Sequence, residues 1–125
     1  MKINRGEIWL VDFGPQMDAN DHLQHGIRPA IIVSNNKANE NSPVIHVVPL
    51  TSKIGKKRFL PTHIFINGYE ASGIERHSIA ECEQLQAINY GNLIECKGKI
   101  SPFQTIKVGL GIQIQLALNM QTSEK

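Results

Sequence analysis

The sequence predicts a small protein of mainly β structure with one C-terminal helix, organised as a single domain over residues 1–125. A chain of 125 residues has the length of one domain and can bury an ordinary core without disulfides or metals. Short apolar runs separated by polar, glycine-containing segments fill most of the chain, and helical spacing begins only after residue 100. These observations favour a small, mostly antiparallel β-barrel with a helix at its end.

The apolar runs predict six strands, at residues 7–13, 28–35, 44–52, 62–67, 77–88 and 96–100. The first, "EIWLVDF", is dense in aromatic and aliphatic residues and suits a strand buried on both faces. Pro29 is tolerated at the start of the second strand, and Pro49 marks a bulge or an edge in the third. The polar segments between strands predict loops or turns, at residues 14–26, 36–43, 53–61 and 68–76.

Two acidic residues lie within the predicted strand at 77–88. Because side chains alternate along a strand, Glu81 and Glu83 should share one face. That face must meet water or a positive group, and Arg76 and Lys97 are the candidate partners.

The C-terminal segment carries the signals of a helix start. Ser101 suits the N-cap, Pro102 the first helical position, and Gln104 completes a capping box. Apolar residues then follow helical spacing, at Ile106, Leu110, Ile114, Ala117 and Leu118. Gly109 and Gly111 each weaken a helix by up to about 1 kcal/mol relative to alanine. The segment "GIQIQLAL" also alternates like a strand, so that alternative stays open.

Composition limits the possible functions. The net charge is +2, so nucleic acid would bind through a local basic patch and not through a polycationic surface. Cys82 and Cys96 form no C-x-x-C pair, and we expect both to be reduced. The N-terminus lacks the apolar run of a signal peptide, and no stretch approaches membrane-spanning length. We therefore expect a cytoplasmic protein without membrane association.

Sequence motifs for cofactor or metal chemistry are missing. The chain has no Walker A loop, no G-x-S-x-G and no H-E-x-x-H. Aspartate occurs only at positions 12, 18 and 21, which gives no cluster for two-metal phosphodiester chemistry. We expect neither a metal nor a cofactor.

Polar residues at strand ends and on loops form the candidate site. Arg28 precedes the apolar run "AIIV", and Thr51, Ser52 and Lys53 end the third strand. The same candidate set continues into the adjoining loop with Lys56, Lys57 and Arg58, and includes the loop histidines His22 and His25. Guanidinium, hydroxyl, imidazole and ammonium groups can hold a phosphodiester and move its protons without metal. Taken singly, each also has an ordinary structural explanation, as a turn arginine, a strand threonine or a solvated loop residue.

The order of these segments resembles one toxin family. "RGEIWLVDF", "GIRPAIIVSN", "VVPLTS", "LPTHI" and "ERHSIAECEQLQAI" precede the predicted helix in the order seen in the MazF and PemK (Kid) toxins. The resemblance runs from about Arg5 to Leu118. It implies an SH3-like β-barrel of the PemK/CcdB type that works as a homodimer and is neutralised by a cognate antitoxin. It also implies a metal-independent, sequence-specific endoribonuclease that cleaves single-stranded mRNA by 2′-hydroxyl attack, leaving a 2′,3′-cyclic phosphate and a 5′-hydroxyl.

The resemblance also implies residue roles. The family's catalytic arginine falls on Arg28 and its catalytic threonine on Thr51, while an assisting glutamine matches Gln84. A loop histidine used by the plasmid-type branch falls on His22, which suits a general base because imidazole titrates near neutral pH. Glu83 is the alternative base.

That branch also uses an Arg and an Asp, whose places hold Glu81 and Glu83 here, and this favours the Arg/Thr mechanism. Loops 14–27 and 53–60 should flank the RNA and contact its bases. The expected substrate-binding residues are Gln84, Glu83, Ser52, Lys53, Lys56 and Lys57.

Two other functions remain as alternatives. Toxins of the same fold poison DNA gyrase, but they share a Trp-Gly-Ile ending that is replaced here by "ALNMQTSEK". A non-catalytic RNA- or protein-binding barrel is the third possibility.

Overall fold

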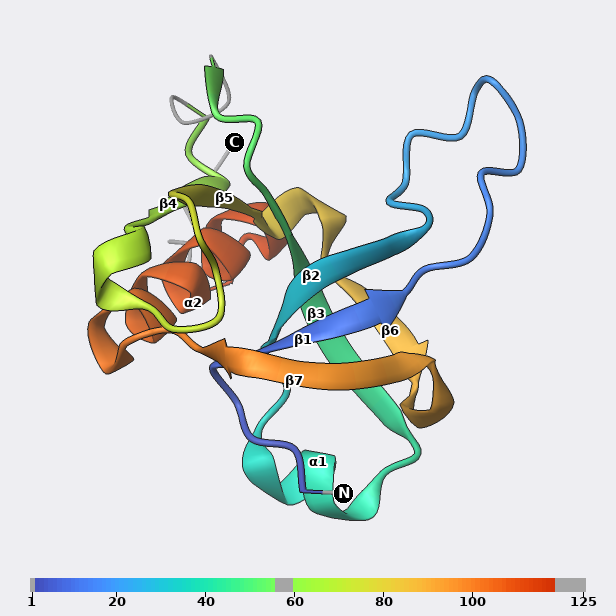
Figure 1. The fold of residues 1–125 in the computed structure, drawn as a ribbon, viewed down its shortest axis with the longest axis horizontal. Coiled ribbons are helices and arrows are strands. Elements are labelled where there is room, and N and C mark those ends of the chain that lie inside the picture. The colour runs from blue at the N-terminus through green and yellow to red at the C-terminus, as the bar shows by residue number, and fades with distance from the viewer. Residues whose placement is uncertain (1, 56–59, 119–125) are drawn as a thin grey trace.

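The computed structural model describes residues 2–55 and 60–118. Within these residues, seven strands form one antiparallel sheet in the order β4-β5-β3-β2-β1-β7, and β6 pairs with β3 off this path (Figure 1). The strands are β1 Glu7–Asp12, β2 Ile27–Ile32, β3 Val44–Thr51, β4 His63–Ile66, β5 Ser78–Glu81, β6 Gln86–Asn89 and β7 Leu93–Lys99. The α-helices are α1, Asn36–Asn41, and α2, Pro102–Leu116. The predicted mainly β fold with a C-terminal helix is confirmed.

The strand pairing of the described residues does not close into a complete barrel, because β4 and β7 lie at the two ends of the path. The long strand β3 connects two parts of the sheet. Its first half pairs with β6, from Val44 to Val47, and its end pairs with β5, at Leu50 and Thr51. Pro49, which cannot donate a backbone hydrogen bond, lies between these two stretches, where β3 changes its partner.

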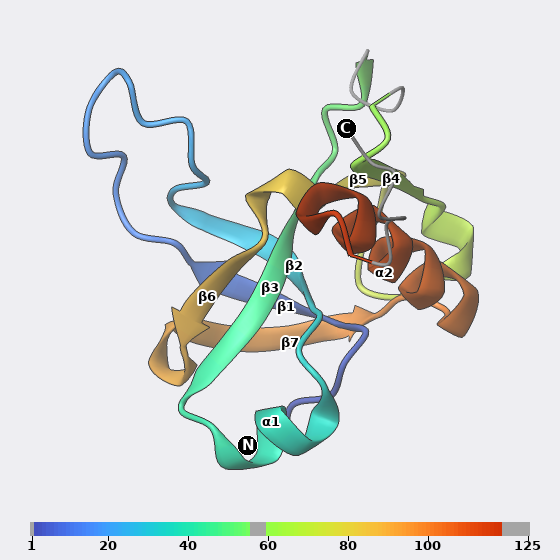
Figure 2. The same cartoon turned by 180° about the vertical axis from the view of Figure 1, so that it is seen from behind.

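Both faces of the central strands are buried, as predicted for residues 7–13. Trp9 and Val11 belong to one core cluster, and Ile8 belongs to a second. Helix α2 covers the second cluster through Val108 (Figure 2). A Cβ at Gly111 would lie 2.7 Å from Cys82 Sγ. The glycine that weakens the helix locally therefore lets α2 approach the sheet closely.

Helix α2 begins as the sequence predicts, and the strand alternative for this segment is wrong. Gln104 N donates to Ser101 Oγ at 3.1 Å, and Ser101 N donates to Gln104 Oε1 at 3.0 Å. The helix ends at Leu116, followed by Ala117 in the left-handed conformation with φ of 55°. None of the helices that the structure describes has the length and apolar character needed to cross a membrane.

The single strand predicted at 77–88 is wrong. Strand β5 ends at Glu81, the 3-10 turn η3 (Cys82–Gln84) follows, and β6 begins at Gln86. Leu85 N donates to Cys82 O at 3.2 Å, which closes the turn. Glu83 therefore lies in a turn and not on the strand with Glu81, although their carboxylate oxygens still come within 4.8 Å of each other, and Glu81 is buried at 4% exposure.

Two further elements differ from the sequence prediction. The turn predicted at 36–43 contains α1, whose N-cap Asn35 accepts a 2.8 Å hydrogen bond from Ala38 N through Oδ1. The short strand predicted at 96–100 corresponds to the C-terminal part of β7. This strand begins at Leu93, directly after the 3-10 turn η4 (Tyr90–Asn92). The predicted loop 53–61 lies partly outside the described residues.

The loop between β1 and β2 extends away from the sheet, at the end of the molecule opposite α1 (Figures 1 and 2). Its base is narrow, since Gly26 N donates to Gly14 O at 2.6 Å and both glycines have positive φ. Farther out, the Asp21 carboxylate accepts hydrogen bonds from Met17 N and Leu23 N, which lower its pKa. The predicted long loop at 14–26 is thus an ordered connection that begins and ends at a glycine.

Residues 71–77, which we call the β5-entry loop, lie against β7. A Cβ at Gly73 would lie only 2.2 Å from Lys97 O, and one at Gly98 only 2.3 Å from Ser72 O. Ser72 N donates to Lys99 O at 2.8 Å, and Lys99 N donates to Ser72 Oγ at 3.0 Å. Only glycine permits this approach at either position, so the β5-entry loop has a fixed place beside the sheet.

Candidate functional site

A cavity of about 330 Å³ opens where β2 and β3 meet the β5-entry loop. We call it the Arg28 cavity. Its polar lining comes from separate parts of the chain, and includes Arg28, Thr51, Ser52, Lys53, Arg76 and Lys97. A larger hollow of about 930 Å³ lies near α1, but four of its lining residues are asparagine and neither arginine nor threonine contributes to it. The chemistry expected from the sequence therefore lies in the Arg28 cavity.

Arg28 is held by the sheet and by the preceding loop. Its backbone pairs with Val11 of β1, and Pro29 follows opposite Leu10. Its Nε donates a 3.3 Å hydrogen bond to the carbonyl oxygen of His25. A guanidinium has five N–H donors, so this bond orients the group and, within the described part of the chain, leaves four donors for an anion. Arginine can contact two oxygens of one phosphate at once.

Thr51 and Ser52 place hydroxyl groups at the end of β3. Thr51 is the last residue of the strand and pairs with Ile79 of β5. Its Oγ1 accepts a hydrogen bond of 3.2 Å from Lys53 N. Because a hydroxyl can accept and donate at the same time, Thr51 can still donate its proton to an oxygen in the cavity.

Arg76 and Lys97 are cavity residues that the sequence did not indicate. The predicted pairing of Glu83 with Arg76 or Lys97 is not the one found, because Glu83 pairs with His63 and Lys97 lies 4.0 Å from Glu95. Arg76 reaches the cavity on the β5-entry loop, and Lys97 lies on β7 where that loop docks.

The charge of the lining follows from these additions. Among the residues that the structure describes, four cationic ones line the cavity, Arg28, Lys53, Arg76 and Lys97, against one acidic residue, Glu75. Such an excess of positive charge favours an anion.

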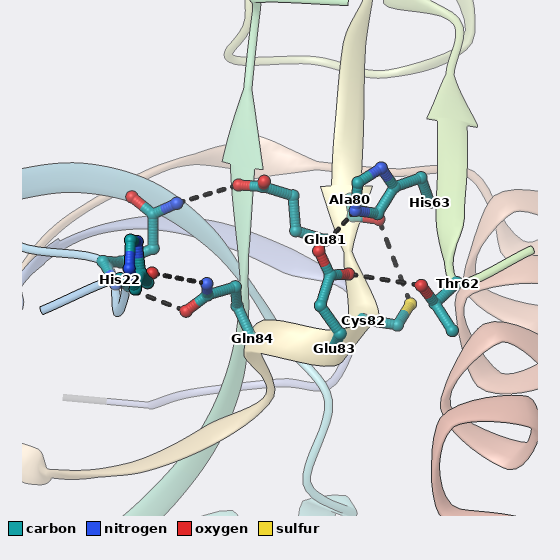
Figure 3. Close-up of polar contacts among 9 residues, drawn as sticks. His22, Thr62, His63, Ala80, Glu81, Cys82, Glu83 and Gln84 are labelled. Carbon is teal, nitrogen blue, oxygen red and sulfur yellow. Dashed lines mark hydrogen bonds and ion pairs between the residues drawn. The ribbon is translucent and has the colours of Figure 1, made fainter. Parts of the chain in front are cut away.

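Gln84 and His22 meet in a second group of polar residues, at the β1–β2 loop (Figure 3). Gln84 Nε2 donates to His22 O at 2.9 Å, and Gln84 Oε1 accepts from Gln24 N at 3.3 Å. Gln24 Nε2 donates to Glu81 Oε1 at 2.8 Å. These bonds fix the backbone of the loop, whereas the His22 side chain is exposed.

The structure does not bring His22, Glu83 or Gln84 into the lining of the Arg28 cavity. Of the other predicted site residues, Ser52 and Lys53 do line it. Lys56 and Lys57 lie outside the described residues.

Among the described residues, one group has the donor atoms for a metal ion. His63, Glu81 and Glu83 each offer a nitrogen or oxygen atom, all within 4.8 Å of one another. This donor set fits a divalent cation. The same atoms also have protein partners, since His63 Nε2 contacts Glu83 Oε2 and Thr62 Oγ1 donates to Glu83 Oε1 at 3.4 Å. These side chains therefore also have hydrogen-bonding partners within the protein when no metal is bound.

The fold and the cavity together define a small, mainly β protein with a cavity whose charged lining is mainly cationic. Comparison with known proteins gives the family. The chain belongs to the PemK-like, MazF-like toxins of type II toxin–antitoxin systems, whose family model matches residues 4–116.

Relatives agree with this assignment, and a solved structure agrees with the fold. The chain is 31% identical to "Endoribonuclease EndoA" of Bacillus subtilis over 118 residues, which cover 94% of this chain and 97% of the relative. It is 30% identical to "Endoribonuclease MazF" of Staphylococcus epidermidis, over 94% of this chain and 93% of the relative. The MazF structure from Deinococcus radiodurans matches the fold with a TM-score of 0.77 at 16% identity, over 94% of this chain and 99% of that one.

Proposed function

We propose that this protein is a metal-independent, sequence-specific endoribonuclease that cuts single-stranded mRNA and acts as the toxin of a toxin–antitoxin pair. The observation that carries the proposal is the meeting of Arg28 and Thr51 in one cationic cavity. Named relatives at about 30% identity along nearly the whole chain are endoribonucleases, which supports the same activity here.

The proposed reaction is an attack by the ribose 2′-hydroxyl on the adjacent phosphorus. The 2′-O–P bond forms, the P–O5′ bond breaks, and the products are a 2′,3′-cyclic phosphate and a 5′-hydroxyl. A base takes the 2′-hydroxyl proton, and the departing 5′-oxygen gains a proton. The phosphorane intermediate carries extra negative charge on its non-bridging oxygens, so donors fixed around those oxygens lower the barrier.

Arg28 and Thr51 have distinct parts in this reaction. Arginine stays protonated in proteins, so we assign Arg28 to stabilising the phosphorane charge through its remaining N–H donors. Thr51 donates a hydrogen bond to a non-bridging oxygen. We keep His22 as the proposed base and Glu83 as its alternative. Neither lines the Arg28 cavity in the described chain, so RNA binding must bring the base closer or the partner protomer must supply it.

The remaining cations of the cavity suit the RNA backbone. Ser52, Lys53, Arg76 and Lys97 can contact phosphates on either side of the scissile one. We propose the same role for Lys56 and Lys57. Gln84 acts with the β1–β2 loop, which would contact splayed bases. Because phosphate contacts release counterions, RNA affinity should fall steeply as the salt concentration rises.

Two protein partners complete the proposal, a second copy of the chain and a cognate antitoxin. A solved structure of the same fold, from mycobacteria, is an endoribonuclease in complex with its cognate antitoxin, with a TM-score of 0.73 at 20% identity. Helix α2 exposes five large apolar side chains, Phe103, Ile106, Leu110, Ile114 and Leu116, which a partner would cover. Light scattering should give about twice 13.9 kDa, and a monomer at micromolar concentration would contradict the dimer.

The test of the function is cleavage of a long RNA in the presence of EDTA. We expect cutting to persist in EDTA and to end in a cyclic phosphate, which mass spectrometry of the products detects. Arg28→Ala should lower the cleavage rate by about 10²–10³-fold, the usual loss for one oxyanion-type donor. Lys37→Ala, which removes an exposed cation on α1 far from the cavity, is the matched control and should cut normally.

A substrate with a single 2′-deoxy sugar at the cut site completes the test. It should bind because its phosphates and bases are intact, but it should not be cut. Cleavage of this substrate, or normal cutting by a folded Arg28→Ala protein, would refute the proposal. RNA binding without cleavage by the wild type would favour a non-catalytic protein, and inhibition of gyrase supercoiling would favour a gyrase poison.

A further inference from the structure

A cluster of three aromatic rings lies next to the Arg28 cavity, on the other side of the β5-entry loop. It consists of Phe65 on β4, Tyr69 on the 3-10 turn η2 (Gly68–Glu70), and His77 at the end of the loop. The His77 ring lies 5.3 Å from the Phe65 ring and 5.3 Å from the Tyr69 ring, centroid to centroid. We call these residues the aromatic cluster.

The exposure of Tyr69 is the unusual feature of this cluster. Its exposed fraction is 91%, the highest among the exposed large hydrophobic residues of the described chain. It contacts His77 in an edge-on arrangement, with an interplanar angle of 77°. A tyrosine this exposed contributes little to the core, so its ring is free for a ligand.

The backbone around the cluster is fixed by hydrogen bonds. Tyr69 N donates to Asn67 Oδ1 at 2.9 Å, which caps the turn η2. Gly68 N donates to His77 Nδ1 at 2.9 Å, which orients the imidazole ring. The His77 ring and the backbone of Tyr69 are therefore held in place before any ligand arrives, and a fixed platform loses less conformational entropy on binding than a mobile one.

The aromatic cluster and the Arg28 cavity are neighbours. A second cavity of about 330 Å³ is lined by Tyr69, His77 and Gly68 together with Glu75 and Arg76. The last two residues also line the Arg28 cavity. A polynucleotide with one phosphate at Arg28 can therefore continue past Arg76 toward Tyr69.

We propose that Tyr69 and His77 form a binding site for an unpaired nucleobase of the RNA, next to the nucleotide whose phosphate is cut. The proposal rests on the proposed ribonuclease function and adds a recognition site to it. Arg76 would hold the phosphate between the two positions, and the Tyr69 ring would stack on the base. Exposed aromatic rings beside a cationic track are the usual means of holding single-stranded nucleic acid.

Glu75 gives the site a preference among bases. A carboxylate accepts hydrogen bonds from exocyclic amino groups, which adenine, cytosine and guanine carry and uracil lacks. Because Glu75 lines both cavities, a base with an amino group should bind better at this site than uracil.

The test begins with the cut site of the wild-type protein, mapped on a long RNA. A short RNA spanning that site, with a 2′-O-methyl group at the reacting sugar to prevent cleavage, is then used for binding by fluorescence anisotropy. Tyr69→Ala should weaken binding by about tenfold or more, because one base–aromatic stack is lost. Tyr69→Phe keeps the ring and should stay within about threefold of the wild type.

RNAs that each lack a single base identify which nucleotide stacks on Tyr69. If one nucleotide beside the cut stacks on Tyr69, removing its base should weaken the wild type about as much as Tyr69→Ala does. The Tyr69→Ala protein should then lose no further affinity for that abasic RNA. Equal losses at every abasic position, or wild-type affinity of Tyr69→Ala, would overturn the site.

Two controls separate the possible failures. If Tyr69→Ala changes the mass measured by light scattering, Tyr69 contacts a second protein copy and the nucleobase site is wrong. If the wild type cuts RNA in an Arg28-dependent manner while Tyr69→Ala binds normally, only the nucleobase site fails. If the wild type does not cut RNA at all, the proposed function fails and the nucleobase site fails with it.

Discussion

Gln84 and His22 are joined across 62 positions of sequence by a hydrogen bond of 2.9 Å from the side-chain amide of Gln84 to the backbone carbonyl of His22. The same amide accepts a hydrogen bond from Gln24 N. Gln84 therefore anchors the loop that leads into Arg28. Its expected role in RNA cleavage then includes positioning this loop.

The first prediction concerns this anchor. Gln84→Ala removes both hydrogen bonds, so hydrogen exchange at the amides of residues 22–25 should accelerate and kcat/KM for RNA should fall. The free energy of unfolding should drop by only about 1 kcal/mol, because the bonds are partly exposed. Gln115→Ala, at an exposed position on α2, is the control. Unchanged hydrogen exchange in Gln84→Ala would show that the loop is held by other contacts.

The second prediction distinguishes the two candidate bases. A general base must be deprotonated, so kcat/KM should rise with pH until the base has lost its proton. Removing the base should flatten this acidic limb of the pH profile and lower the plateau. We expect this behaviour for His22→Ala and a normal limb for Glu83→Gln.

Glu83→Gln also breaks the contact with His63, so His63→Gln is its control. If Glu83→Gln flattens the limb and His63→Gln does not, Glu83 is the base. A normal limb in all three variants would exclude both candidates.

The third prediction compares two glycines of α2, one with room for an added methyl group, Gly109, and one without, Gly111. Gly109→Ala should raise the free energy of unfolding by up to about 1 kcal/mol, since alanine favours the helix. Its new Cβ would lie 3.4 Å from the end of the Arg5 side chain, which can move.

Gly111→Ala should lower the free energy of unfolding by about 1–3 kcal/mol through overpacking. Its Cβ would lie 2.7 Å from Cys82 Sγ and 2.9 Å from Ile64 Cγ1. Urea denaturation measures both variants. Equal effects of the two substitutions would contradict the close approach of α2 to the sheet.

The fourth prediction concerns the two thiols. Burial raises the pKa of Cys82 to about 12, and its Sγ lies 3.6 Å from Val108 O. Cys96 is exposed. A thiol reagent at pH 8 should therefore modify Cys96 in the native protein and Cys82 only after unfolding, as intact mass spectrometry would record. Rapid modification of Cys82 in the native state would contradict its burial.

The raised pKa of Cys82 also has a consequence for stability. The protonated thiol is favoured in the folded state, so its contribution is complete below the unfolded value of 9.0 and is lost as the pH rises toward 12. Cys82→Ala should flatten this alkaline decline in the free energy of unfolding.

Local signals in the sequence predicted local structure well. Ser101 and Gln104 predicted the start of α2 because a capping box involves only four neighbouring residues. Helix α1 was missed because its six residues, five of them polar and one an alanine, show no apolar spacing. The break between β5 and β6 was missed because the segment begins with "AECE", which alternates like a strand. The contact of Gln84 with the distant β1–β2 loop is not visible in the sequence.

The candidate site was predicted only in part, for a similar reason. The resemblance to the family placed Arg28 and Thr51, and both line one cavity. Arg76 and Lys97 complete that lining through the contact of Gly73 with β7, which depends on residues more than twenty positions apart. Nothing near Arg76 in the sequence indicates which strand it will meet.

The contact between the β5-entry loop and β7 also affects the exposed edge of the sheet, because β7 is the last strand in the strand order. A strand with a free edge can pair with a strand of another molecule, which leads to aggregation. At β7 this edge is occupied near Lys99 by Ser72, and Gly73 lies directly against Lys97 and Gly98. The other end of the sheet, β4, has only four residues, too few for extended pairing. The contact that brings Arg76 to the cavity thereby also blocks strand pairing with a neighbouring molecule at the Lys97–Lys99 end of β7.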